Sequence, residues 1–280
     1  MQTRSMAVLG VVAAIAMSCA KPPEHSPIEA GARYVALGSS FASGPGLGPM
    51  PADGCLRSTA NYASYAAAAL NLKLTDVSCA SATTDNIVIG PQRTGAGEQP
   101  PQIAAVTADT RLVTLTIGGN DVGYAAALDK FGCADAGACT PEAVDEKSIQ
   151  QATDGLSARL VTAIEAIREA APQADVLLVT YPQIVPSDGS TCPALVLSAD
   201  HAAAMAAIGV RLNEAFRSAA SATGARLVDV YAASADHTAC ATDPWVAGWV
   251  PTDDPSGAHA YHPTGAGMRA VAGMVVAAVG

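Results

Sequence analysis

Four polar clusters in the sequence contain residue types that together could carry out acyl transfer. They are Gly38-Ser39-Ser40-Phe41, the stretch from Ser78 to Thr84, Gly118-Gly119-Asn120-Asp121 and His259-Ala260-Tyr261-His262-Pro263. A serine hydroxyl is a weak nucleophile until a base removes its proton, and the oxyanion that forms needs hydrogen-bond donors. The clusters predict a site in which a serine attacks, a histidine moves the proton, and an asparagine with backbone N–H groups binds the oxyanion.

The first three clusters each follow an apolar segment that is typical of a buried strand. Predicted strands cover residues 34–37, 72–77, 111–117, 175–180 and 226–230. They alternate with predicted helices, which is the pattern of a parallel sheet covered on both faces. Because sites in such sheets lie at the carboxyl ends of the strands, we expect the clusters to converge on one edge. The sequence therefore predicts one α/β domain, with no internal repeat and no second domain.

The predicted helices and loops between these strands are less regular. Helices are predicted over residues 61–70, 198–223 and 263–278, with a short helix over 101–105. Apolar side chains at helical spacing also predict one helix that contains Ile149 and Ile167 and ends at Pro172. Pro263 is expected in the first turn of the terminal helix, where its missing N–H is tolerated. Residues 90–101 and 129–141 are predicted loops.

The composition indicates an acidic globular domain. The chain has 280 residues, 50% of them apolar, with only 15 lysines and arginines and a formal net charge of −10. That apolar content is sufficient for a sizeable core. So few cations argue against a phosphate backbone as partner, so we predict no nucleic-acid binding and interpret the acidity as a solubility feature.

The N-terminal 20 residues are typical of an export signal. Arg4 supplies the positive start, and residues 6–17 form an apolar run that is too short to span a bilayer. Two alternatives remain open for its removal. Cleavage after Ala20 would free the protein, whereas lipid attachment at Cys19 would make it a bacterial lipoprotein. In either case residues 21–30 are a predicted tether and residues 31–280 a predicted folded domain.

Six cysteines remain when Cys19 is set aside. They are Cys55, Cys79, Cys133, Cys139, Cys192 and Cys240. An even count in an exported chain predicts three disulfides. Cys133 and Cys139 flank a short loop and form an easy local pair, while the other pairings stay open. The sequence contains no CxxC pair and no HExxH stretch, so we predict neither a metal site nor a cofactor.

At the four clusters the sequence resembles the SGNH, or GDSL-type, esterases and lipases, of the secreted actinobacterial kind with three disulfides. The resemblance covers nearly the whole predicted domain. It implies that Ser40 is the nucleophile and His262 the general base. It implies an oxyanion hole formed by the N–H groups of Ser40 and Ser81 and the side-chain amide of Asn120. It also implies a three-layer α/β/α sandwich with a five-stranded parallel sheet of the flavodoxin-like kind.

Two departures from the family pattern concern the loops around the nucleophile. Ser39 replaces the aspartate that usually precedes the nucleophile, which changes the hydrogen bonding of the turn. Ser81 replaces a glycine, which keeps the backbone donor but leaves the loop less room.

A third departure concerns the histidine. His259 occupies the position of the family's triad aspartate, and an imidazole cannot stabilise the imidazolium that forms at His262. Some relatives without this acid use the backbone carbonyl at that position to accept the Nδ1–H bond. We therefore predict a Ser40–His262 dyad in which the His259 carbonyl orients the base. The alternative is Asp253 or Asp254, reaching in from the preceding loop.

The resemblance implies a secreted or cell-envelope ester hydrolase that forms an acyl-enzyme with a small-molecule or lipid ester. We predict a monomer, with membrane anchoring only through lipidation of Cys19. The alternatives are a polysaccharide O-deacetylase or a phospholipase of the same fold, and a catalytically silent envelope binding protein. An α/β-hydrolase is disfavoured because Ser40 lies too near the N-terminus and Ala42 breaks the GxSxG pattern.

Overall fold

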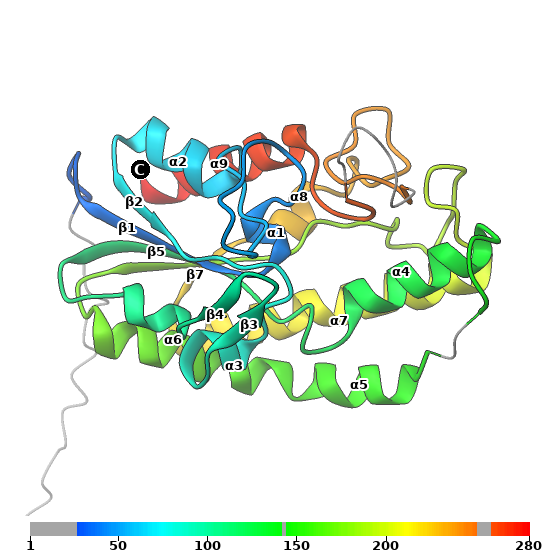
Figure 1. Cartoon of the computed structure of the whole chain (residues 1–280), viewed down its shortest axis with the longest axis horizontal. Coiled ribbons are helices and arrows are strands. Elements are labelled where there is room, and N and C mark those ends of the chain that lie inside the picture. Colours follow the sequence, from blue (N-terminus) through cyan, green and yellow to red (C-terminus); the bar gives the residue numbers. More distant parts are fainter. Residues whose placement is uncertain (1–26, 142–143, 251–258) are drawn as a thin grey trace, which may run out of the picture.

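A five-stranded parallel sheet forms the centre of the computed structural model, which describes residues 27–141, 144–250 and 259–280 (Figure 1). The strands are β1 (Arg33–Gly38), β2 (Lys73–Asp76), β5 (Thr110–Thr116), β6 (Asp175–Val179) and β7 (Arg226–Val228). They lie in the order β2-β1-β5-β6-β7, and each neighbouring pair is parallel. This is a doubly wound order, whose switch point lies between β1 and β5. The predicted five-stranded parallel sheet is confirmed.

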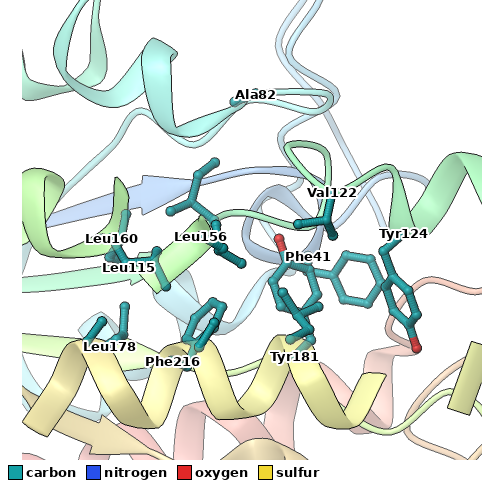
Figure 2. Packing of buried hydrophobic residues seen from close by; sticks show 14 of the residues in the cluster. Phe41, Ala82, Leu115, Val122, Tyr124, Leu156, Leu160, Leu178, Tyr181 and Phe216 are labelled. Atoms are coloured by element: carbon teal, nitrogen blue, oxygen red, sulfur yellow. The ribbon is translucent and has the colours of Figure 1, made fainter. Parts of the chain in front are cut away.

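The central strands β1, β5 and β6 are buried on both faces, which explains why they carry apolar residues at successive positions. In β1, Tyr34 and Ala36 pack in one cluster with α2 (Tyr62–Leu70) and α9 (Gly265–Val279). Val35 and Leu37 pack in a second cluster with α6 (Leu156–Ala170) and α7 (Ala199–Thr223). Successive side chains of a strand point to opposite faces, so both sets need apolar residues. Figure 2 shows part of the second cluster, where Phe216 of α7 lies among the side chains beneath the sheet.

Helices cover the sheet on both sides, as predicted for a three-layer α/β/α fold. They are α1 (Ser40–Ser43), α2 (Tyr62–Leu70), α3 (Thr84–Val88), α4 (Tyr124–Asp135), α5 (Glu146–Asp154), α6 (Leu156–Ala170), α7 (Ala199–Thr223), α8 (Val230–Ala233) and α9 (Gly265–Val279), with a 3₁₀ helix η1 at Gln102–Ala105. In Figure 1, α2 and α9 lie over one face of the sheet, and α6 and α7 lie against the other. Within the described ranges, no helix combines the length and hydropathy needed to cross a membrane.

One predicted loop, residues 90–101, contains a short hairpin. Its antiparallel strands are β3 (Gln92–Thr94) and β4 (Gly97–Gln99). Three-residue polar strands give no clear alternation of apolar and polar positions, so the sequence did not indicate them. The hairpin packs on the loop after α1, because the Thr94 hydroxyl donates to the carbonyl of Asp53 (3.0 Å).

Two predictions about helix boundaries were wrong, and each error lies at a glycine. Residues 129–141 were predicted as a loop, but α4 continues to Asp135 through Gly132. A Cβ at Gly132 would lie 2.1 Å from the hydroxyl oxygen of Tyr261, so this helix requires glycine at a close contact. The helix predicted to end at Pro172 is divided at Gly155 into α5 and α6. Gly132 therefore lies within a continuous helix, whereas Gly155 separates two helices.

The two ends of the chain also differ in detail from the prediction. Ile28, in the predicted tether, packs against the α2–α9 cluster. At the C-terminal helix, Thr264 is the N-cap residue of α9, so Pro263 precedes the helix and does not lie in its first turn. The predicted export signal at residues 1–20, with Cys19, lies outside the described residues, as do residues 21–26.

Three disulfides join the six cysteines. The pairs are Cys55–Cys79, Cys133–Cys139 and Cys192–Cys240. The predicted count of three and the predicted local pair are confirmed, and the two pairs that had been left open are now defined. Disulfides of this number are typical of proteins that mature in an oxidising compartment.

Candidate active site

Ser40 is held at the carboxyl end of β1 by a sharp turn. It is the first residue of α1, and only 7% of its surface is exposed. The preceding N–H, of Ser39, donates to the carbonyl of Thr116 in β5 (2.9 Å). A Cβ at Gly38 would lie 2.5 Å from that same carbonyl oxygen, so only glycine lets the chain pass there. The turn thus fixes the serine relative to two neighbouring strands.

The side chain of Gln102, in η1, fixes the end of β1 from a third direction. Its Oε1 accepts the N–H of Gly38 (2.8 Å), and its Nε2 donates to the carbonyl of the same residue (3.0 Å). Gln102 is 5% exposed, so both bonds are shielded from water. The sequence does not point to this residue, because a single glutamine outside any motif carries no signal.

His262 forms a dyad with Ser40. Its Nε2 lies 2.9 Å from Ser40 Oγ, and its Nδ1 lies 2.7 Å from the carbonyl oxygen of Ala260. A carbonyl can only accept, so the proton resides on Nδ1 and Nε2 is free to accept the serine proton. Burial lowers the pKa of His262 from its ordinary 6.5 to about 4; the Ala260 bond opposes this shift, and nearby His259 adds to it. The base is therefore neutral at neutral pH.

The carbonyl that orients the histidine is not the one predicted. The His259 carbonyl accepts the backbone N–H of His262 (3.3 Å), so it closes a turn and is not the partner of the imidazole. The next carbonyl, of Ala260, faces Nδ1 instead. Tyr261 adopts a left-handed backbone conformation (φ 58°) between them. The alternative residues Asp253 and Asp254 lie outside the described part of the chain.

The predicted oxyanion donors lie on loops that leave the same edge of the sheet. Ser40, Ser81 and Asn120 follow β1, β2 and β5, which are neighbours in the sheet. Within residues 27–141, 144–250 and 259–280, no acceptor pairs with the backbone N–H of Ser40 or Ser81. The Asn120 Nδ2 donates one hydrogen bond to the carbonyl of Ala82 (2.8 Å), which leaves its second N–H available.

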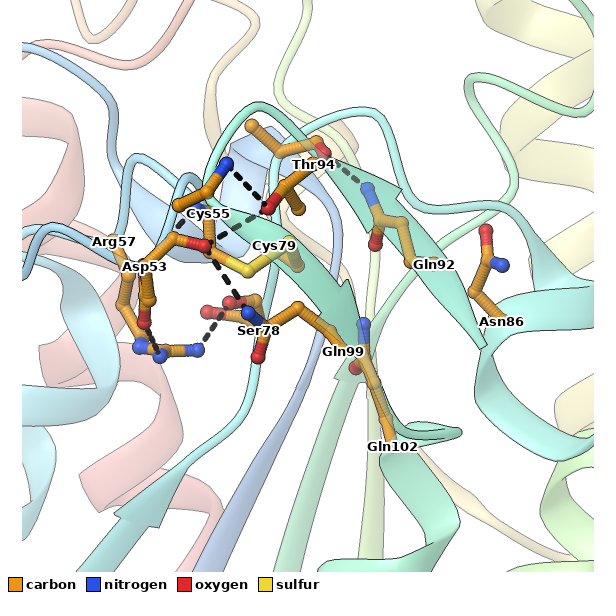
Figure 3. The surroundings of a disulfide bond; sticks show 12 residues. Asp53, Cys55, Arg57, Ser78, Cys79, Asn86, Gln92, Thr94, Gln99 and Gln102 are labelled. Atoms are coloured by element: carbon orange, nitrogen blue, oxygen red, sulfur yellow. Dashed lines mark hydrogen bonds and ion pairs between the residues drawn. A yellow bond between two sulfur atoms is a disulfide. The ribbon is translucent and has the colours of Figure 1, made fainter. Parts of the chain in front are cut away.

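The loop of Ser81 is held by a disulfide and by the hairpin. Cys55 is bonded to Cys79, and the carbonyl of Cys55 accepts the N–H of Ala80 (2.9 Å). From the other side, Gln92 Nε2 donates to the carbonyl of Ala80 (2.6 Å). Figure 3 shows these side chains around the bridge. They hold Ser81 in a left-handed conformation (φ 65°), which explains why glycine is usual at this position.

A carboxylate joins the second and third clusters. Asp121, next to Asn120, accepts the backbone N–H of Thr84 at the start of α3 (3.0 Å) and also the hydroxyl of that threonine. The guanidinium of Arg159 lies 3.4 Å from the same carboxylate. The side chain of Asp121 is 7% exposed, so this ion pair is shielded. It fixes the loop that carries Asn120 against the start of α3.

The chain matches known proteins over most of its length. A family model described as GDSL-like Lipase/Acylhydrolase matches residues 36–270. Lipase 2 of Streptomyces coelicolor is 37% identical over 219 residues, which cover 74% of this chain and 72% of that protein. A lipase of Streptomyces rimosus is 30% identical over 239 residues, covering 84% of this chain and 82% of that protein.

Solved structures agree with these sequence matches. Phospholipase A1 from Streptomyces albidoflavus NA297 superposes with a TM-score of 0.72 and 27% identity, covering 89% of this chain and 99% of that one. The extracellular lipase from Streptomyces rimosus has a TM-score of 0.68 and 28% identity, with the same coverage. The Ser40–His262 contact at the sheet edge is consistent with these matches. The matches show that the chain belongs to the GDSL-like lipase/acylhydrolase family and is a carboxylic ester hydrolase.

Proposed function

We propose that Ser40 and His262 hydrolyse the ester through an acyl-enzyme. Ser40 Oγ attacks the ester carbonyl while His262 Nε2 takes its proton. The observation that carries this proposal is the 2.9 Å contact between these two atoms, with Nδ1 engaged by the Ala260 carbonyl. The lowered pKa of His262 keeps the imidazole neutral, as a general base requires.

In the next step, the N–H groups of Ser40 and Ser81 and the Nδ2 of Asn120 stabilise the oxyanion. The bond from carbon to the leaving oxygen then breaks, and His262 gives its proton to the departing alcohol. Water attacks the acyl-enzyme, with His262 again as base, and the carboxylic acid leaves Ser40. Each donor sits on rigid backbone or on a bonded side chain, so little reorganisation accompanies the developing charge.

For the substrate, we propose an ester of a lipid-type acyl chain. The support comes from the relatives above, which are named lipases and a phospholipase A1. A polysaccharide O-deacetylase and a phospholipase are the alternatives within the same chemistry. A silent binding protein is disfavoured, because the serine and histidine are already within hydrogen-bond distance.

The test is hydrolysis of p-nitrophenyl esters, from acetyl to palmitoyl, by the wild-type protein and by Ser40→Ala. Loss of activity and of fluorophosphonate labelling in Ser40→Ala is expected. A preference for long chains would support the lipid ester, and activity on acetate alone would support the deacetylase. Phosphatidylcholine hydrolysis, followed by the fatty acid released, tests the phospholipase. Equal rates for the wild-type protein and Ser40→Ala would refute the assignment.

We propose an extracytoplasmic, monomeric enzyme. The three disulfides support an oxidising compartment. Intact mass of the exported protein distinguishes the two alternatives at its N-terminus. A chain beginning at Lys21 would indicate a free protein, and a diacylated Cys19 would indicate a lipoprotein. Size-exclusion chromatography with light scattering tests the monomer.

A further inference from the structure

The hydroxyl of Tyr181 connects two loops of the active site. Tyr181 follows β6 by two residues, is 3% exposed, and lies beneath the turn of the nucleophile (Figure 2). Its oxygen accepts the backbone N–H of Gly119 (2.9 Å) and lies 3.2 Å from Ser39 Oγ. The Gly119 N–H can only donate, so the hydroxyl proton of the tyrosine is free to bond Ser39. Gly119 and Ser39 are the residues directly before Asn120 and Ser40.

The ring of Tyr181 extends this connection to the base. Phe41 packs against Tyr181 with ring centroids 4.7 Å apart, and against His262 with centroids 4.9 Å apart. A Cβ at Gly119 would lie 2.9 Å from the tyrosine hydroxyl oxygen, so this approach is possible only with glycine. One buried side chain therefore contacts the loops of the serine and the asparagine directly, and reaches the histidine through Phe41.

We propose that Tyr181 is a positioning residue that sets the spacing between the nucleophile Ser40 and the oxyanion donor Asn120. The inference rests on the function proposed above. Tyr181 touches neither substrate nor reacting atoms; it acts through Ser39 and Gly119. Because the spacing matters most when the oxyanion has formed, its loss lowers kcat rather than raising KM.

The hydroxyl bridge also has a constant protonation state in ordinary buffers. Burial raises the pKa of Tyr181 to about 12, and its hydrogen bonds with Ser39 and Gly119 partly oppose that rise. The bridge therefore does not titrate between pH 5 and pH 9. A variant without the hydroxyl is expected to lower the rate by the same factor throughout that range.

The experiment compares Tyr181→Phe with Tyr34→Phe. Tyr34 is a matched control: it is fully buried, and its hydroxyl bonds Thr114 Oγ1 (2.8 Å) away from the catalytic loops. Tyr181→Phe is expected to lower kcat for p-nitrophenyl butyrate on the order of tenfold or more, with KM within about twofold. The rate of Ser40 labelling by a fluorophosphonate should fall by a similar factor. Tyr34→Phe should lower stability to urea and leave both rates within about twofold.

The variant Ser39→Ala tests the same bridge from its other end. It should lower kcat several-fold on its own, and add nothing when combined with Tyr181→Phe, because the bond is then already absent. If Tyr181→Phe does not fold, a folded Ser39→Ala with unchanged kcat overturns the proposal, and one with lowered kcat supports it. The proposal is also overturned if the kcat losses of Ser39→Ala and Tyr181→Phe multiply in the double variant. Equal kcat losses in Tyr181→Phe and Tyr34→Phe overturn it as well.

Failure of this inference and failure of the proposed function give different results. If Ser40→Ala keeps its activity and its labelling, the proposed function is wrong whatever Tyr181 does. If Ser40→Ala is inactive while Tyr181→Phe matches the wild-type protein, only the positioning role is wrong.

Discussion

The two halves of the active site are held in different ways. The strand half, defined as residues 38–43, 78–84 and 118–121, follows three neighbouring strands, β1, β2 and β5. The histidine loop, defined as residues 259–264, follows no strand among the described residues. Apart from the contact with Ser40, its hydrogen bonds to segments distant in the sequence are with other loops. The proposed nucleophile and oxyanion donors therefore take their positions from the sheet, whereas the proposed base does not.

The histidine loop rests on a second loop instead. The carbonyl of His262 accepts the N–H of Ala247 (2.9 Å), and the N–H of Tyr261 donates to the carbonyl of Gly248 (3.0 Å). The hydroxyl of Tyr261 donates to the carbonyl of Leu195 (2.8 Å). The segment that contains Leu195 lies near the Cys192–Cys240 disulfide. The position of the base thus depends on loop contacts and a covalent bridge, so changes there should affect turnover more than stability.

The largest effect is expected in the strand half, at Asn120. Asn120→Ala removes an oxyanion donor and should lower kcat on the order of 10²–10³ fold, measured with p-nitrophenyl esters. KM should change much less, because the donor acts mainly on the transition state. Thermal unfolding of the variant checks that the loss of the bond to Ala82 has not disrupted the loop. A kcat within about twofold of wild type would remove Asn120 from the oxyanion hole.

The next largest effect is expected in the histidine loop, where the protonation of His262 should make kcat/KM depend on pH. In the proposed cycle His262 acts in its neutral form. Because its pKa is about 4, kcat/KM should remain level down to about pH 4 and then fall about tenfold per pH unit. With the ordinary pKa of 6.5, the rate at pH 5 would already be about 30-fold lower. A pH–rate profile with a neutral ester measures this. An acid limb centred near pH 6.5 would contradict the burial of the base.

The same pKa shift makes the stability of the folded protein depend on pH. The folded-state pKa of His262 is lowered, so between pH 6.5 and about 4 the unfolded chain binds more protons than the folded one. The free energy of unfolding should therefore decrease as the pH falls through this window, by roughly 3 kcal/mol in total for this group. Circular dichroism at each pH separates this loss of folding stability from the loss of activity that protonation of His262 causes.

A smaller effect should follow when the support of the histidine loop is displaced. A Cβ at Gly248 would lie 2.0 Å from the carbonyl oxygen of Ala194, so Gly248→Ala must move one loop relative to the other. Because the Gly248 carbonyl binds Tyr261, the shift reaches His262, and kcat should fall about tenfold. Gly273→Ala is the control, since beyond the adjacent backbone of α9 no atom lies within 4 Å of a Cβ there. Equal kcat for the two variants would contradict the loop model.

The smallest effect is expected at Ser81, in the strand half. Ser81→Gly relieves a left-handed conformation (φ 65°) and should raise the free energy of unfolding by about 0.5 kcal/mol, after the greater freedom of glycine in the unfolded chain is counted. Ser218→Gly, on the exposed face of α7, should lower it by a similar amount. Urea denaturation of both variants tests the difference in sign.

The sheet and the principal side chains were predictable because they carry strong local signals. Five strands alternate with helices, and the segments after β1, β2 and β5 carry Ser40, Ser81 and Asn120 in short polar turns. Burial on both faces of a parallel sheet requires such strands, so the sequence pattern follows from the architecture. The disulfide count followed in the same way from the six cysteines.

The supporting contacts were not predictable, because they depend on tertiary distances. Whether the carbonyl of His259 or of Ala260 faces the imidazole depends on the left-handed backbone of Tyr261, which no local pattern indicates. Gln102 and Tyr181 contact the site across 64 and 62 residues of sequence, so neither belongs to a local motif. The sequence therefore identified the reacting groups, and only the structure identified what holds them.

The neutral carbonyl behind His262 has a consequence for the choice of alcohol. An imidazolium with no anionic partner among the described residues and a pKa of about 4 is a strong acid, so in the proposed cycle it protonates even a basic departing alkoxide readily. Removal of the serine proton by so weak a base is then the demanding part of acylation. The rate should consequently depend little on the basicity of the leaving alcohol, and aliphatic and aryl esters of one acid should be cleaved at similar speeds.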